Sequence, residues 1–104
     1  MNSVEVFRAL GDPVRLKIVK MVATAGELCV CHIVEELGMS QPAVSHHLTR
    51  LRYSGLLKAR KEGQWVYYSL NLNVLEELGI DVLNDLVKAA KSALYKGACY
   101  QSDV

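Results

Sequence analysis

Two cysteines separated by a single residue are the side chains of this sequence best suited to chemistry. Cys29 and Cys31 lie at the expected start of a helix, where the positive end of the helix dipole lowers the pKa of a thiol and favours the thiolate. The thiolate is the form of cysteine that binds metals, and as a soft ligand it selects soft, thiophilic ions. The pair therefore predicts a site for a soft ion at this helix start.

The other candidate ligands are single residues. Cys99 is the third cysteine of the chain, and an isolated cysteine is usually a small buried residue. His32 follows the pair, but a lone histidine beside a helix start is more often a surface or capping residue than a ligand. The thiols of a cytoplasmic protein are normally reduced, so a structural disulfide is not expected. The sequence holds no nucleophile–base set, phosphate loop or cofactor fingerprint, so no enzyme activity is expected.

The cysteine pair directly precedes two expected helices joined by a tight turn. The first helix begins at about Cys31 and ends at Gly38, which suits the left-handed end of a helix. Ser40 can cap the second helix, with Pro42 in its first turn. Two helices with this connection predict a helix-turn-helix over about residues 31–54.

The second of these helices has one apolar and one polar side. Val44, Leu48 and Leu51 recur at the i, i+4, i+7 spacing of a face turned to the core. An ordinary surface helix would look similar, but the turn before it and the basic hairpin after it favour a role in reading DNA. His47 lies nearer the apolar side and is expected to pack or to form a hydrogen bond. The residues of this helix expected to contact DNA are Gln41, Ser45, His46, Thr49 and Arg50.

A β-hairpin is expected directly after this helix, over about residues 56–70, because the aromatic and β-branched segment Trp65–Leu70 is typical of a strand. Residues 40–70 hold five Lys/Arg and one acid, a formal charge of +4, whereas the segments before and after carry −1 and −2. A local positive patch is the electrostatic footprint of a nucleic-acid site. It argues against a winged helix used only for protein contacts. The hairpin residues expected to contact DNA are Arg60, Lys61 and Gln64.

Helices are expected at both ends of the chain. One spans Val4–Leu10, and Asp12 followed by Pro13 is a strong start for a second. A broad apolar stripe covers about residues 73–97, where Gly79 can divide it into two helices. Because this stripe exceeds what a small domain can cover, we interpret it as a dimerisation helix.

Composition is consistent with one domain, residues 1–104, since 51% of the 104 residues are hydrophobic and only 22% are charged. The apolar content exceeds what a small monomer needs, which again indicates a subunit interface. No apolar run is long enough to span a membrane and no signal peptide opens the chain, so we expect a cytoplasmic protein with no membrane partner. The expected fold class is mainly α with a β-hairpin wing: a winged helix-turn-helix that forms a homodimer through its terminal helices.

Four segments of the sequence resemble the ArsR/SmtB family of metal- and metalloid-responsive transcriptional repressors. They are ALGDPVRLKIV (9–19), ELCVC (27–31), LGMSQPAVSHHLTRLRYSGLL (37–57) and RKEGQWVYYSL (60–70), in the order and spacing of the family. The Ser-Gln-Pro start of the second helix and the Cys-Val-Cys before it are the most specific of these features. The resemblance implies a homodimer that binds double-stranded operator DNA without a cofactor and releases it when an effector binds.

The sequence departs from the family pattern near the effector site. His32 follows Cys-Val-Cys where close relatives have Asp, and Val34 stands where some arsenic-responsive members have a third cysteine. The resemblance implies As(III) or Sb(III), or another soft metal ion, as effector. Because a trivalent metalloid prefers three sulfur ligands, we expect it to bind the thiolates of Cys29, Cys31 and Cys99. The alternatives are a redox or persulfide sensor in which Cys99 pairs with one of the other two cysteines, and a sensor of Cd, Pb or Zn.

Overall fold

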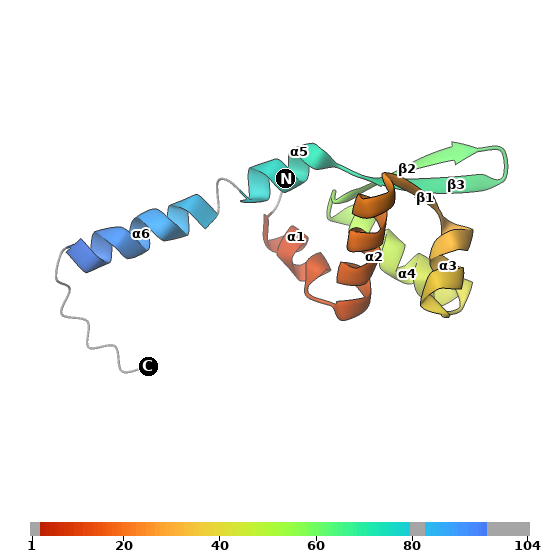
Figure 1. Ribbon diagram of the computed structural model, residues 1–104, viewed down its shortest axis with the longest axis horizontal. Helices are drawn as coiled ribbons and strands as arrows, with labels where there is room; N and C mark the ends of the chain where they lie inside the picture. The colour runs from red at the N-terminus through yellow and green to blue at the C-terminus, as the bar shows by residue number, and fades with distance from the viewer. Residues whose placement is uncertain (1–2, 80–82, 96–104) are drawn as a thin grey trace. The chain divides into compact units, whose positions relative to one another are not determined.

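Helices make up most of the described residues, and three strands form one small sheet (Figure 1). The structure, a computed structural model, describes residues 3–79 and 83–95. It divides into two units, residues 1–74 and 75–104, and the division falls within α5. In the described part of the chain, no helix has the length and apolarity needed to cross a bilayer. The elements in order are α1 (Ser3–Leu10), α2 (Pro13–Ala25), β1 (Glu27–Cys29), α3 (Val30–Leu37), α4 (Gln41–Tyr53), β2 (Leu57–Glu62), β3 (Trp65–Leu70), α5 (Leu72–Glu77) and α6 (Leu83–Tyr95).

Helices α3 and α4 form a helix-turn-helix whose turn is set by its capping residues. Gly38 ends α3 with a left-handed backbone (φ 63°, ψ 28°) and donates its amide to the carbonyl of Val34 at 3.0 Å. Ser40 caps α4, because its hydroxyl accepts a hydrogen bond from the amide of Ala43 at 3.3 Å, and Pro42 occupies the first turn. These are the residues that the sequence assigns to the two helix ends.

The inner face of α4 packs into the core of the first unit. Val44, Leu48 and Leu51 have 1% or less of their surface exposed, as their helical spacing predicts. Burying each such side chain stabilises the fold by about 1.5–3 kcal/mol. This packing fixes α4 through one side and leaves its other side accessible. The remaining fully buried side chains of the described residues are Val6, Ile18, Val22, Ile33 and Leu56.

The sheet has three antiparallel strands in the order β1–β3–β2. Strands β2 and β3 pair from Leu57 opposite Leu70 to a turn at Gly63, and they form the expected wing. Strand β1 pairs with the edge of β3 that faces away from β2, with Cys29 opposite Tyr67. A segment of three residues is too short for its sequence to distinguish a strand from the lead into a helix. Its pairing with β3 attaches the cysteine pair to the wing.

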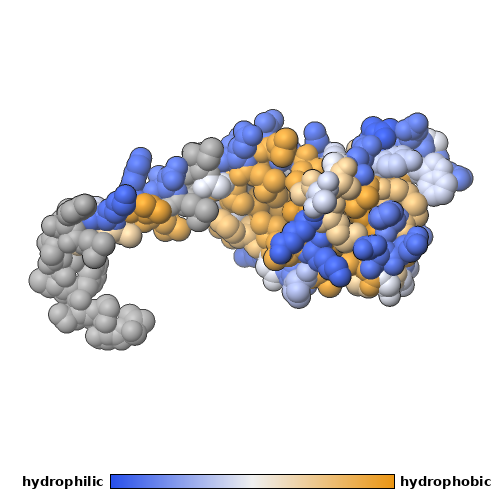
Figure 2. Space-filling model, in the orientation of Figure 1, coloured by the Kyte–Doolittle hydropathy of each residue, from blue (hydrophilic) through white to orange (hydrophobic). Residues whose placement is uncertain are grey.

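Two helices, α5 and α6, cover the stripe that the sequence assigns to dimerisation. Residues 80–82 and 96–97 of that stripe lie outside the described residues. Leu86 and Val87 on α6 are 62% and 50% exposed, and Figure 2 shows hydrophobic and hydrophilic atoms on separate edges of this helix. Helix α6 is therefore amphipathic and has an apolar edge open to a partner.

Replacing Gly38 by Ala should lower the free energy of unfolding by about 1 kcal/mol, because a residue with a Cβ is strained at a left-handed backbone position. An added Cβ would meet no atom within 4 Å, so the loss reports backbone strain alone. Gly38→Asn should lose less, since Asn tolerates this conformation. Urea denaturation measures both variants, and a Gly38→Ala protein as stable as the parent would contradict the assignment.

Candidate nucleic-acid interface and thiol site

The outer side of α4 carries the side chains that the sequence predicts to contact DNA. Gln41, His46, Thr49 and Arg50 are exposed, and Ser45 is half-buried. The Thr49 hydroxyl donates to the carbonyl of Ser45 at 2.9 Å, which orients it along the helix. The predicted residues therefore share one accessible side of one helix, with donors and acceptors at the surface.

Arg15 on α2 fixes α4 against the end of α1. Its Nε donates to the carbonyl of Ala9 at 2.6 Å, and its Nη1 lies 3.4 Å from Nδ1 of His47. Asp12 accepts hydrogen bonds from the amides of Arg15 and Val14, and these donors hold the pKa of Asp12 below its usual value. His47 thus has the hydrogen-bonding role expected from its place beside the apolar stripe.

The basic residues of the wing differ in their surroundings. The Nε and Nη2 atoms of Arg60 contact the two carboxylate oxygens of Glu27 at 3.1 and 2.9 Å, and its Nη1 donates to Glu62. Its guanidinium also lies 4.8 Å from the centre of the Tyr67 ring. The hydrogen bond from Arg60 lowers the pKa of Glu27, and the two carboxylates raise the pKa of Arg60. Lys61 is exposed and forms no ion pair with any described residue. Hydrophilic side chains gather over this end of the molecule in Figure 2.

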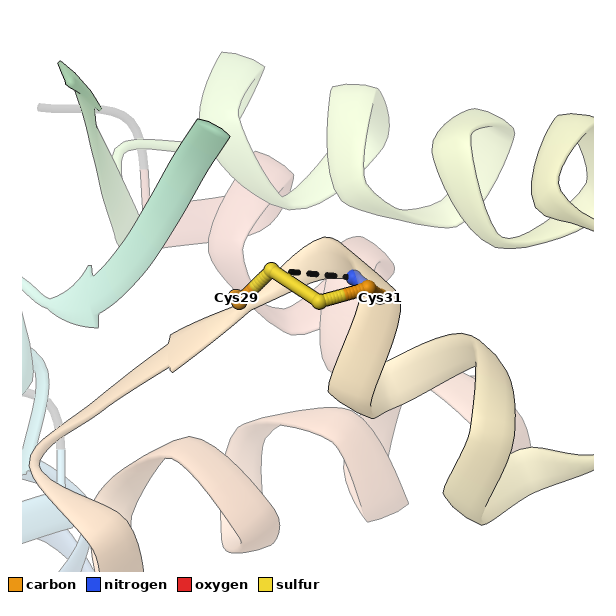
Figure 3. The surroundings of a disulfide bond; sticks show 2 residues. All are labelled: Cys29 and Cys31. Atoms are coloured by element: carbon orange, nitrogen blue, oxygen red, sulfur yellow. Dashed lines mark hydrogen bonds between the residues drawn. A yellow bond between two sulfur atoms is a disulfide. The ribbon is translucent and has the colours of Figure 1, made fainter. Parts of the chain in front are cut away.

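Cys29 and Cys31 meet where β1 runs into α3 (Figure 3). Cys29 is the N-cap of α3, and its sulfur accepts the amide of Cys31 at 3.3 Å. The structure joins the two sulfurs in a disulfide, with Cα atoms 5.3 Å apart, so the expectation that the thiols are unpaired is wrong for this structure. The physical reason is the N-cap backbone: the extended Cys29 is followed at once by a helical turn that brings Cys31 back beside it. After reduction, this arrangement presents two thiols to one ion.

A cavity of about 180 Å³ lies beside the cysteine pair. Gln41, the first residue of α4, and Gln64 in the wing turn both line it. The structure thus brings the two thiols together with two residues predicted to contact DNA. The full set of lining residues is Cys29, Val30, Cys31, Gln41, Gln64, Trp65 and Val66.

The predicted third ligand, Cys99, lies outside the described residues. Within residues 3–79 and 83–95, no three His, Cys, Asp or Glu side chains are grouped so that they could hold a metal ion. His32 lines a separate cavity with residues of α2. The cysteine pair therefore supplies two sulfur ligands suited to a soft ion, one fewer than a trivalent metalloid prefers.

Sequence reasoning missed three residues of this region: Glu27, Trp65 and Tyr67. The only local signal for Glu27 is an acid two residues before Cys29, which places it on the same face of a strand. Its partner Arg60 is 33 residues away. The sequence predicts that Trp65 and Tyr67 belong to the wing, but it does not predict that they lie near the cysteines. The pairing of β1 with β3 brings them there.

Comparison with known proteins identifies the family. A family model described as "Bacterial regulatory protein, arsR family" matches residues 12–59. A helix-turn-helix transcriptional regulator of Methanocaldococcus jannaschii, itself uncharacterized, is 52% identical over 67 residues, which make up 64% of this chain and 75% of that protein. This chain belongs to the arsR family. That family consists of DNA-binding transcriptional regulators and not of enzymes.

Relatives of this arsR-family protein are named for different effectors. The arsenical resistance operon repressor of Escherichia coli K12 is 46% identical over 71 residues, or 68% of this chain and 61% of the repressor. The cadmium resistance regulatory protein CadC homolog of Staphylococcus aureus is 42% identical over 78 residues, or 75% of this chain and 64% of that protein. The matched region thus spans less than two thirds of either relative, and their names do not assign one effector.

A solved structure confirms the fold class. The homodimeric winged helix-turn-helix DNA-binding domain of a possible ArsR-family regulator from Mycobacterium bovis matches with a TM-score of 0.66 at 30% identity. The match covers 86% of this chain and 78% of that one. The winged helix-turn-helix predicted from the sequence is therefore correct.

Proposed function

We propose that this arsR-family protein is a repressor that releases operator DNA when a thiophilic effector binds Cys29 and Cys31. The observation that carries the proposal is the cavity that the two cysteines share with Gln41 and Gln64. An effector held by the thiolates lies against the first residue of α4 and against the wing turn. Its binding therefore acts on two elements that must fit the DNA together.

We propose a cytoplasmic location, because operator DNA and the reducing conditions that keep thiolates free are both found there.

On DNA, a dimer places its two α4 helices in successive major grooves of a near-palindromic site, with half-sites about 34 Å apart. The hydrogen-bond donors and acceptors on the base edges of the major groove suit the polar side of α4. Phosphate contacts make the affinity fall steeply with salt concentration. No cofactor is needed for this step. The proposed base contacts are Gln41, Ser45, His46 and Thr49, and the proposed backbone contacts are Arg50, Lys61 and Gln64.

The homodimer forms through the terminal helices. The apolar edge of α6, with Leu86 and Val87 well exposed in the single chain, supports this assignment. Phe7 on α1 is 46% exposed and offers apolar surface on the first unit as well. Dimerisation would cover these side chains and remove apolar area from water, which favours association by about 25 cal/mol for each Å² buried.

The effector that best suits the thiols is As(III) or Sb(III), held by Cys29, Cys31 and Cys99. The name of the Escherichia coli relative supports an arsenical. Each thiol that binds loses its proton, and the ion then ties α3 to the C-terminal segment. Release follows because the effector binds the DNA-free conformation more tightly, a coupling typically of about 1–3 kcal/mol.

A second candidate is a redox sensor, and the disulfide between Cys29 and Cys31 supports it. In that function an oxidant takes two electrons from the two thiols, two protons leave, and the S–S bond forms. With a low-molecular-weight persulfide as the oxidant, one thiolate takes its outer sulfur and expels a thiolate, and the second cysteine thiolate then forms the S–S bond and expels hydrosulfide. A third effector class is a divalent ion, Cd, Pb or Zn, on the same ligands, and the name of the Staphylococcus aureus relative supports Cd.

Replacing Ser45 or His46 by Ala should weaken binding to the operator by about tenfold, since a specific base contact contributes about 1–3 kcal/mol of discrimination. Binding to unrelated DNA should change much less. Fluorescence anisotropy with both duplexes measures the difference. Thr24→Ala is the control, because it removes an exposed polar side chain from α2 and leaves α4 unchanged. Equal losses on both duplexes would show that these side chains do not read bases.

Leu86→Glu should convert the dimer to a monomer and abolish operator binding, because it puts a charge into an apolar contact. Sedimentation velocity measures the mass of the species. Lys88→Glu on the same helix is the control for a change of charge, and it should remain dimeric. A monomeric parent protein would rule out the dimer.

Ser in place of Cys29 or Cys31 should abolish release of operator DNA by arsenite from the reduced protein, because each variant keeps only one sulfur of the pair that lines the cavity. Cys99→Ser should raise the arsenite concentration needed for release, by about tenfold for a coupling loss of about 1.4 kcal/mol. Anisotropy titrations with arsenite, cadmium, zinc and a mild oxidant measure this for each variant.

Two outcomes of these titrations would change the assignment. If Cys99→Ser releases DNA at the arsenite concentration of the parent protein, Cys99 is not a ligand and the pair is sufficient. If the parent protein responds to the oxidant but not to any of the ions, the redox function replaces the metalloid one.

A further inference from the structure

We propose that Arg60 is a positioning residue that links the cysteine pair to the wing through Glu27, and that it is not the phosphate contact its sequence position indicates. The inference rests on the proposed effector function, since it describes how the cysteine site acts on the wing. It is carried by the side-chain geometry of Arg60, by the register of the sheet and by the local charge.

The sheet register places the cysteine site and Arg60 in one row. Cys29 on β1 is opposite Tyr67 on β3, and Tyr67 is opposite Arg60 on β2. Paired residues point to the same side of a sheet, and Glu27 shares that side with Cys29 because strand side chains alternate. The Arg60 side chain crosses the ring of Tyr67 and reaches both carboxylate oxygens of Glu27.

This contact joins two strands that do not pair with each other. The order β1–β3–β2 keeps β1 and β2 on opposite sides of β3. Among the described residues, the Glu27–Arg60 ion pair is the only ion pair that joins β1 to β2. A displacement of the end of β1, where Cys29 binds the effector, therefore reaches the first strand of the wing through this side chain.

The local charge argues against a phosphate contact at Arg60. Its guanidinium is hydrogen-bonded to two carboxylates, Glu27 and Glu62. The three side chains together carry a net charge of −1, which repels a phosphate. A phosphate would have to displace a two-point carboxylate contact to bind there, and such contacts are among the stronger charge-assisted hydrogen bonds. Lys61 on the same strand is exposed and has no carboxylate partner among the described residues.

A double-mutant cycle tests the link with arsenite as the probe. Operator affinity is measured with and without arsenite for the parent, Glu27→Gln, Arg60→Gln and the double variant, and the ratio of the two affinities is compared. Each single variant should reduce this ratio about threefold, the size expected for an exposed ion pair, and the double variant should reduce it no further. Without arsenite, Glu27→Gln should bind DNA within about twofold of the parent.

Lys58→Gln is the matched control. Lys58 is on β2, on the same side of the sheet as Arg60, and it lies opposite Ser69. Lys58→Gln also removes one positive charge, but Lys58 forms no ion pair with any residue that the structure describes, so its arsenite ratio should equal that of the parent. If instead Arg60→Gln weakens DNA binding as Lys61→Gln does, and Glu27→Gln leaves the ratio unchanged, Arg60 is a phosphate contact and the proposal is wrong.

A parent protein that keeps its DNA in arsenite would overturn arsenite as the effector, and amide hydrogen exchange then decides the link alone. If the link exists, Arg60→Gln on β2 should speed exchange at residues 27–29 on β1, and Lys58→Gln should not. Unchanged exchange at β1 in Arg60→Gln would overturn the link whatever arsenite does.

Discussion

The antiparallel pairing of β1 with β3 is the interaction on which the rest of this structure depends. Only three residues, Glu27–Cys29, join the sheet in this way. The last of them also caps α3 and carries the first thiol of the pair. One residue thus belongs at the same time to the sheet, to the helix-turn-helix and to the thiol site. Without this pairing, no backbone hydrogen bonds would connect the cysteine pair to the wing.

The same pairing accounts for the closeness of effector chemistry and DNA chemistry. The cavity beside the thiols is lined by the first residue of α4 and by the wing turn, and both elements must be correctly placed to bind an operator. A small ion on two sulfurs changes the charge and the packing at that point. The protein needs only two conformations whose free energies differ by a few kcal/mol. A change of this kind can then shift the population between them and switch DNA binding.

Local signals in the sequence predict the helix-turn-helix well. Caps such as Asp12, Ser40 and Gly38 act within three or four residues, so their effect is visible without the fold. Strand β1 has too few residues to show a period, and the Glu27–Arg60 ion pair joins residues 33 apart. The sequence therefore predicts Cys29 and Cys31 as a site. It does not predict that Trp65 and Gln41 lie beside them, because that closeness depends on the sheet and on the turn before α4.

The claim that a thiol-bound effector in this cavity controls DNA binding is tested most directly by watching the cavity and the DNA in one titration. Trp65 is the only tryptophan of the chain and lines the cavity, so its emission reports occupancy. Reduced protein bound to labelled operator is titrated with arsenite while emission and anisotropy are recorded. We predict that the Trp65 signal and the release of DNA share one midpoint. Saturation of the Trp65 signal with the DNA still bound would contradict the claim.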